Sequence, residues 1–257
     1  MEEVVVHSVK NRVGVIELAR PEKFNCLSTA TIRGIDEARV LFEADPEVRA
    51  VLIRSRGKYF CTGADLDEVT QVQSESELDQ FIGFGQQVLM RLEASPLPVI
   101  VAVQGLCLAG GLELMLSADI CFAAETAQIG DQHAQFGLIP GWGGSQRLTR
   151  ILGLRRALDL LFTARWMTVQ EAASAGLINR VIPDNQLHDE AMKYCTTLAT
   201  RSRDGLAEMK RLARQGLELP LSAAMRLERD AVVRHLQGSD VEEGLAAFAA
   251  HRTPEFK

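Results

Sequence analysis

Residues 99–147 read VIVAVQGLCLAGGLELMLSADICFAAETAQIGDQHAQFGLIPGWGGSQR. An apolar strand pattern leads into a glycine turn, a short helix that carries Glu113, and a second glycine-rich turn at 140–144. Glycines allow backbone N–H groups to approach a ligand closely. A lone acid in apolar surroundings, with His133 twenty positions later, indicates a buried reaction site.

The chain before this stretch alternates between strand and helix patterns. We expect a hairpin over 4–17, a helix over 29–44 capped by Ser28 or Thr29, a strand over 48–55, a helix over 75–94 and a strand over 99–103. Such alternation is typical of an α/β core.

The chain after this stretch is mostly helical. Helix patterns cover 148–162, 168–175, 187–200, 205–217, 221–236 and 241–251, and the last strand pattern lies at 177–182. We therefore expect an α/β core over residues 1–195 and a helical region over 196–257.

Composition restricts the function classes. The net charge of −6 and the lack of a Lys/Arg run argue against nucleic acid as a partner. The five cysteines are odd in number and lack CxxC pairs, which argues against a zinc site and a disulfide scaffold and favours a reducing compartment. The start has no signal or transit character, and the uncharged run 97–112 is too short for a membrane span. We expect a cytoplasmic protein with no membrane association.

Two residues are candidates for proton transfer, and for each a purely structural role is the alternative. A carboxylate in the first turn of a helix, such as Glu113, is stabilised by the helix dipole alone, but burial would raise its pKa into a catalytic range. The two explanations carry equal weight here. A lone histidine such as His133 is more often structural than catalytic.

Backbone donors form the second candidate feature. The N–H groups of Ala64 and Gly110 each lie at a glycine turn before a helix, and together they would form an oxyanion hole if the fold brings them together. Glycines at such places also simply make tight turns. Trp142 would either wall an apolar pocket or pack in the core.

Other chemistries lack their motifs. The chain has no Gly-x-Ser-x-Gly elbow, no Gly-x-Gly-x-x-Gly and no P-loop. Nucleophilic catalysis, dinucleotide binding and phosphoryl transfer are therefore poorly supported.

Four motifs in order resemble the crotonase superfamily, the enoyl-CoA hydratase/isomerase family. They are RPEKFN at 20–25, FCTGAD at 60–65, VQGLCLAGGLEL at 103–114 and IPGWGGSQRL at 139–148. Residues 172–181 and 243–248 are also similar to the family, so the resemblance covers nearly the whole chain.

The resemblance implies a crotonase-like spiral of ββα units with a C-terminal helical trimerisation region. It also implies a homotrimer or a dimer of trimers, and an acyl-CoA substrate of fatty acid metabolism. The thioester oxygen would sit between the Ala64 and Gly110 N–H groups. No cofactor beyond the coenzyme A of the substrate, and no metal, is implied.

The family resemblance also assigns side chains. Glu113 matches the first of two glutamates used by hydratases, and His133 stands where the second is expected. Gly141 and Trp142 would position the water or the substrate. Residues implied in CoA binding are Lys23, Phe24, Thr62 and Asp65, and a C-terminal Arg252 or Lys257 would reach a phosphate from a neighbouring subunit.

The first hypothesis is a lyase of enoyl-CoA hydratase type, in which Glu113 activates water and His133 handles the α-proton. A crotonase-family isomerase, or a hydrolase that cleaves a C–C bond of a cyclic β-ketoacyl substrate, is the nearest alternative. A non-catalytic acyl-CoA-binding protein is an alternative of another class. The ClpP-type serine protease shares the architecture, but its nucleophilic serine is missing here.

Overall fold

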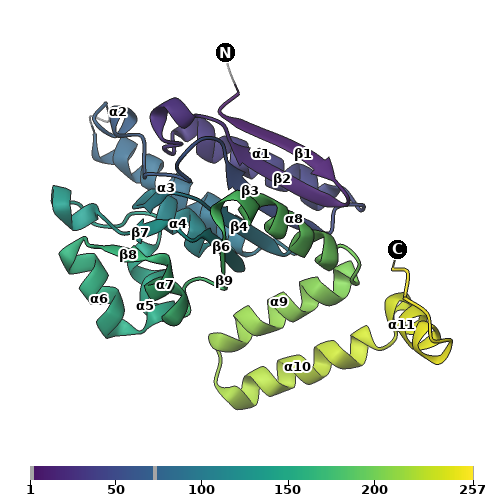
Figure 1. Ribbon diagram of the computed structural model, residues 1–257. Coiled ribbons are helices and arrows are strands. Elements are labelled where there is room, and N and C mark those ends of the chain that lie inside the picture. Colours follow the sequence, from purple (N-terminus) through teal and green to yellow (C-terminus); the bar gives the residue numbers. More distant parts are fainter. Residues whose placement is uncertain (1–2, 72–73, 257) are drawn as a thin grey trace.

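A six-stranded sheet forms the centre of the computed structural model, which describes residues 3–71 and 74–256 (Figure 1). Its spatial order is β1 (Val5–Lys10), β2 (Val13–Leu18), β3 (Ala50–Ser55), β4 (Val99–Val103), β6 (Ile120–Ala124) and β9 (Arg180–Ile182). The β1/β2 hairpin is antiparallel, and the other neighbours pair in parallel. All five β4 residues are buried, as a parallel strand covered on both faces requires.

Helices cover both faces of this sheet. In Figure 1, α1 (Thr29–Ala44) and α3 (Glu75–Glu93) lie behind it, and α8 (Leu187–Leu198) crosses in front. The Ser28 hydroxyl accepts a hydrogen bond from the Thr31 N–H and so caps α1. Ser74 and Glu77 form a capping box at the start of α3. The expected hairpin, helices and strands up to residue 103 are confirmed, with ends that differ by one or two residues.

A second, three-stranded sheet was not expected. It contains β5 (Leu106–Leu108), β7 (Gln128–Gly130) and β8 (Trp166–Thr168). Three residues are too few for an alternating apolar pattern to stand out, so periodicity does not reveal such strands. β6 was also missed, although it is a buried apolar run. The strand β5 of this small sheet leads directly into the helix that contains Glu113.

Short helices lie between the longer elements along the chain. They are η1 (Pro21–Lys23), α2 (Leu66–Val69), α4 (Gly110–Leu116), η2 (His133–Phe136), α5 (Gly144–Leu152), α6 (Leu154–Thr163), α7 (Val169–Ser174) and η3 (Asp184–Gln186). The single helix expected over 148–162 is wrong. It is two helices, because Gly153 adopts φ +76° and ψ 157°, a conformation that ends α5 and begins α6.

The C-terminal helices extend away from the sheets, with α9 and α10 side by side and α11 at the far end (Figure 1). Their bounds are α9 (Arg203–Leu217), α10 (Leu221–His235) and α11 (Ser239–Ala249). The boundary expected after residue 195 falls inside α8, which buries Leu187, Ala191 and Cys195 against the large sheet. α8 therefore belongs with the core, and the extended helical region begins at α9. No helix in the described ranges is long and apolar enough to span a bilayer.

Candidate active site

Glu113 is held inside the protein by the second glycine turn. It lies in the first turn of α4 and is 1% exposed. Its Oε1 atom accepts hydrogen bonds from the Trp142 N–H at 2.7 Å and the Gly144 N–H at 2.8 Å. Oε2 accepts none from the described residues. The carboxylate is thus fixed through one oxygen, and the other is available for chemistry.

Burial raises the pKa of Glu113 above its usual range, although the Gly144 N–H, the charge of His133 and the Trp142 N–H oppose the shift. A helix dipole alone would have lowered it. Of the two explanations for this residue, buried proton transfer is therefore favoured over simple stabilisation of a helix end.

The two predicted oxyanion donors are brought together. Residues Cys61 and Cys107 form a parallel bridge that joins the two glycine turns. A Cβ atom built on Gly110 would lie 3.2 Å from the Ala64 nitrogen. Neither N–H donates a hydrogen bond to any described residue. The two N–H groups are therefore adjacent and have no acceptor among the described residues, which is the arrangement an oxyanion hole needs.

Close backbone approach at this point depends on a glycine. A Cβ atom on Gly111 would lie 2.3 Å from the Cys61 carbonyl oxygen. Ala109, which caps α4, has φ +47° and ψ −117°, a region that L-residues rarely occupy. The turn that presents the Gly110 N–H is thus built at a cost in local strain.

His133 faces two carboxylates. It begins η2, is largely buried, and its Nδ1 lies 3.0 Å from the Asp131 Oδ1 atom. Burial lowers the pKa of His133, but the hydrogen bond to Asp131 and the charges of Asp131 and Glu113 more than offset this, and the net shift is upward. The predicted Glu113 and His133 are therefore electrostatically coupled. The sequence analysis did not predict a role for Asp131, although an acid two positions before the histidine could have indicated one.

Trp142 fills the space between α3 and the oxyanion donors. It is 3% exposed, its ring centroid lies 5.5 Å from that of Phe81, and its Cζ3 would lie 2.9 Å from a Cβ on Gly110. The position of Trp142 suits both expected roles, packing in the core and lining a pocket. The N–H of Gly141 donates to no described residue, whereas its carbonyl accepts a hydrogen bond from Gln86. The predicted role of Gly141 in positioning water stays a prediction.

The residues implied in CoA binding lie together around η1 and α2. Lys23 pairs with Asp67 at 2.9 Å, and the exposed Phe24 ring packs edge-on against Tyr59. Thr62 is half-buried. Their contacts with CoA stay predictions.

Asp65 has a structural role. Its carboxylate accepts a hydrogen bond from Arg20 at 3.0 Å and caps α2 through the Asp67 N–H. At the C-terminus, Arg252 pairs with Glu243, and Lys257 lies outside the described residues.

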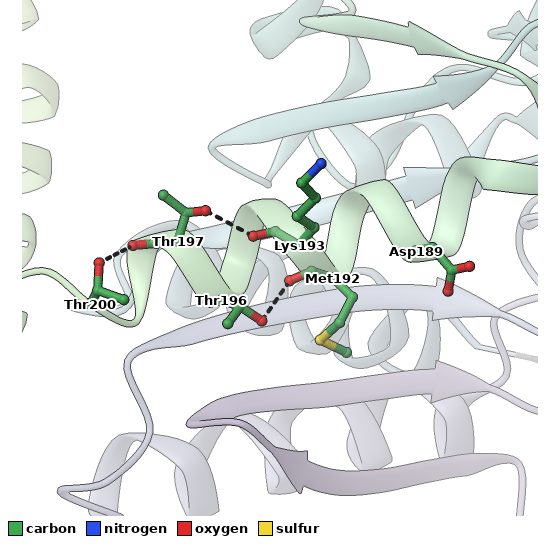
Figure 2. Close-up of a pocket in the computed structure, with 6 residues that line it drawn as sticks. All are labelled: Asp189, Met192, Lys193, Thr196, Thr197 and Thr200. Carbon is green, nitrogen blue, oxygen red and sulfur yellow. Dashed lines mark hydrogen bonds between the residues drawn. The ribbon is translucent and has the colours of Figure 1, made fainter.

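A cavity of about 440 Å³ lies along α8 and holds none of the candidate groups (Figure 2). It is lined by Asp189, Met192, Lys193, Thr196, Thr197 and Thr200. The three threonine hydroxyls donate to carbonyls of the helix itself at 2.8–3.0 Å. Its polar groups are largely used within α8, and we assign this cavity no role.

Known proteins match this chain along nearly its full length. A family model described as "Enoyl-CoA hydratase/isomerase" matches residues 8–257. The chain belongs to the enoyl-CoA hydratase/isomerase family. A "Probable enoyl-CoA hydratase" of Rhizobium meliloti is 36% identical over 256 residues, covering 99% of this chain and 98% of that protein.

Two further members of this family are also similar. The "Crotonyl-CoA hydratase" of Syntrophomonas wolfei is 32% identical over 99% of this chain and 98% of its own. The crystal structure of an enoyl-CoA hydratase from Bacillus anthracis superimposes with a TM-score of 0.95 at 31% identity, covering 99% of each chain. The crotonase fold expected from the motifs is therefore confirmed.

Proposed function

We propose that this protein is an enoyl-CoA hydratase, a lyase that adds water to a 2-enoyl-CoA or removes it from the product. The observation that carries the proposal is the buried carboxylate of Glu113, which has one free oxygen and is coupled to His133. Beside it lie the N–H groups of Ala64 and Gly110, which have no acceptor among the described residues. An acid–base pair next to an oxyanion hole suits addition across a thioester-conjugated double bond.

The proposed step balances in protons and electrons. Glu113 takes a proton from water as the water oxygen bonds to the β-carbon. The π electrons move to the thioester oxygen, where the Ala64 and Gly110 N–H groups stabilise the enolate. The enolate then collapses as His133 gives a proton to the α-carbon. Transfer of the proton from Glu113 back to His133 through water restores the starting state.

Substrate assignment follows from the relatives and the wall residue. Relatives named enoyl-CoA and crotonyl-CoA hydratases support a 2-enoyl-CoA substrate. Trp142 packs beside the oxyanion donors, where the acyl group would lie. An apolar wall of this kind suits an apolar acyl chain.

The test is hydration of crotonyl-CoA by the purified protein, followed as loss of the enoyl thioester absorbance. We expect turnover that falls by about 10²–10⁴-fold in Glu113→Gln, the value of a general base. Full activity of Glu113→Gln on a panel of 2-enoyl-CoA substrates would reject the assignment. Tight acyl-CoA binding in calorimetry without conversion of any substrate would instead favour a non-catalytic binding protein.

A second candidate is hydrolytic cleavage of a C–C bond in a cyclic β-ketoacyl substrate. The hydrogen bond between Asp131 and His133 favours it, because a histidine oriented by a carboxylate is also suited to activating water for attack on a carbonyl. Both reactions add one water, so the gain in mass alone does not separate them. The substrate and the new group do, because hydration converts a 2-enoyl-CoA to a hydroxyacyl-CoA and cleavage opens the ring of a cyclic β-ketoacyl substrate to a free carboxylate. Isomerisation would leave the mass unchanged.

The C-terminal helices and the cysteines bear on the assembly and the location of the protein. Helices α9–α11 expose large apolar side chains, Met209, Leu217, Leu221 and Phe248 among them, which supports a homotrimer or a dimer of trimers. Light scattering coupled to gel filtration measures that mass. The five free cysteines support a reducing, cytoplasmic location, and the chemistry proposed above uses no cofactor beyond the CoA of the substrate.

A further inference from the structure

The turn after β7 holds Asp131 and His133 in a fixed relation. Asp131 is fully buried, and its Oδ1 accepts hydrogen bonds from His133 Nδ1 at 3.0 Å and from the His133 backbone N–H at 3.3 Å. The Gln132 side chain donates to the Ala164 carbonyl, and the Leu138 N–H donates to the His133 carbonyl at 3.0 Å. Contacts on both sides therefore restrain the turn.

This contact sets the tautomer of the ring. A neutral imidazole has one N–H donor, and a carboxylate can only accept, so Nδ1 carries the hydrogen. Nε2 forms no hydrogen bond with the described residues and is not among their enclosed polar atoms, so it keeps contact with solvent. Nε2 is thus the one ring nitrogen free to exchange a proton.

The charge balance also favours a protonated ring. The charged groups that face His133 are Asp131 in its own turn and Glu113 from α4. Asp131 Oδ2 is enclosed and has no hydrogen-bond partner among the described residues. A buried carboxylate with a free oxygen is costly unless a positive charge lies beside it, and an imidazolium supplies that charge.

We propose that Asp131 is a positioning residue: its buried carboxylate holds the His133 ring in one tautomer and stabilises the imidazolium that gives its Nε2 proton to the α-carbon. This inference rests on the proposed hydration, in which His133 is the proton donor. Asp131 touches no reacting atom and acts through His133 alone.

A purely structural role for Asp131 makes a different prediction. Asp131 also accepts the His133 backbone N–H and so stabilises the start of η2. An asparagine at this position can still accept both hydrogen bonds through its amide oxygen, but it carries no charge. Asp131→Asn therefore retains the turn and removes only the electrostatic contribution.

The first experiment is a double-mutant cycle with crotonyl-CoA, using wild type, Asp131→Asn, His133→Gln and the double variant. We expect Asp131→Asn to lower kcat by about 10–100-fold, the loss typical when a carboxylate that orients a metal-binding histidine is replaced. In the His133→Gln background the same change should cost nothing further. Equal losses in both backgrounds would overturn the proposal.

The second experiment needs no turnover. The chain has five histidines, and the signal of His133 is assigned in NMR spectra as the one lost in His133→Gln. We expect the pKa of His133 to be lower in Asp131→Asn than in wild type. An unchanged pKa would refute the inference. If the pKa falls but no enoyl-CoA is hydrated, Asp131 still controls the ring and the proposed function is what fails.

A matched control is Asp119→Asn. Asp119 is also a largely buried aspartate, but it pairs with Lys210 at 2.7 Å and with Arg214 at 2.7 Å, on α9. Its loss should lower the melting temperature without changing the pKa of His133. A fall in that pKa as large as in Asp131→Asn would show a general effect of removing buried charge and would count against the proposal.

Discussion

The indole of Trp142 lies against the backbone of Gly110, so that a Cβ atom at Gly110 would come within 2.9 Å of Trp142 Cζ3. The same Cβ would lie 3.2 Å from the nitrogen of Ala64. The glycine therefore leaves open the space where the proposed thioester oxygen would bind, and the tryptophan bounds that space.

Gly110→Ala should disable the oxyanion hole. The added methyl group has no room to move, since backbone lies on one side and a packed ring on the other. We expect kcat for crotonyl-CoA to fall by about 10²–10³-fold, the value of one oxyanion donor. Steady-state kinetics measures the loss, and a variant with wild-type kcat would contradict this role for Gly110.

Gly85→Ala, in helix α3, should disturb the site by displacing the Trp142 side chain. Its Cβ would lie 2.3 Å from Trp142 Nε1, so the indole must shift. Because the backbone N–H of the same residue, Trp142, holds Glu113, we expect kcat to fall by about 10–100-fold, and overpacking to cost about 1–3 kcal/mol. Calorimetric melting and kinetics test the two effects.

Gly83→Ala is the matched control in the same helix. A Cβ at Gly83 meets no atom within 4 Å. Alanine in a helix interior is more favourable than glycine by about 0.5–1 kcal/mol, so this variant should be slightly more stable and fully active. Loss of activity here would mean that α3 responds to any substitution, not to a clash with Trp142.

Glu113→Gln should stabilise the fold while it removes activity. Burial raises the pKa of Glu113, so the folded state favours the protonated acid and its stability decreases as pH rises through that pKa. A neutral glutamine avoids this penalty and can still accept the two N–H groups. We expect a higher melting temperature than wild type at pH 8, with an advantage that shrinks as the pH falls toward the ordinary carboxyl pKa. A lower melting temperature at pH 8 would contradict it.

The pH profile of kcat/KM should be bell-shaped. Glu113 must be ionised and His133 protonated in the free enzyme, and the pKa of each is raised. The acid limb should therefore lie above the ordinary carboxyl range and the basic limb above the ordinary imidazole range. A profile that rises with pH through both ranges would mean that His133 acts as a neutral base, as in the hydrolytic alternative.

Much of this candidate site could be predicted from the residue types in the sequence. A glycine turn before a helix predicts exposed N–H donors at Ala64 and Gly110, and an acid among leucines predicts the buried Glu113. Ser28 at the start of α1 was also predictable, because capping is a local interaction. Local features of this kind depend on neighbours within a few positions, which the sequence displays directly.

Other features depend on distant contacts. The strands β5, β7 and β8 are three residues each and exist because they pair with one another across the chain. Asp131 gains its importance from full burial beside the His133 ring, and that burial is not determined by its sequence neighbours, although the spacing of the two residues is visible in the sequence.

By itself, the sequence determined the α/β alternation, the family motifs and the candidates Glu113, His133, Ala64 and Gly110. Only the tertiary structure decided that the N–H groups of Ala64 and Gly110 are adjacent, that Trp142 and Gly144 hold one oxygen of Glu113, and that a buried Asp131 orients His133. The physical reason is the separation, along the sequence, of the residues that determine each feature. Turns and caps follow from local backbone preferences, whereas burial and hydrogen bonds between residues 29 or more positions apart arise only when the sheets and helices pack.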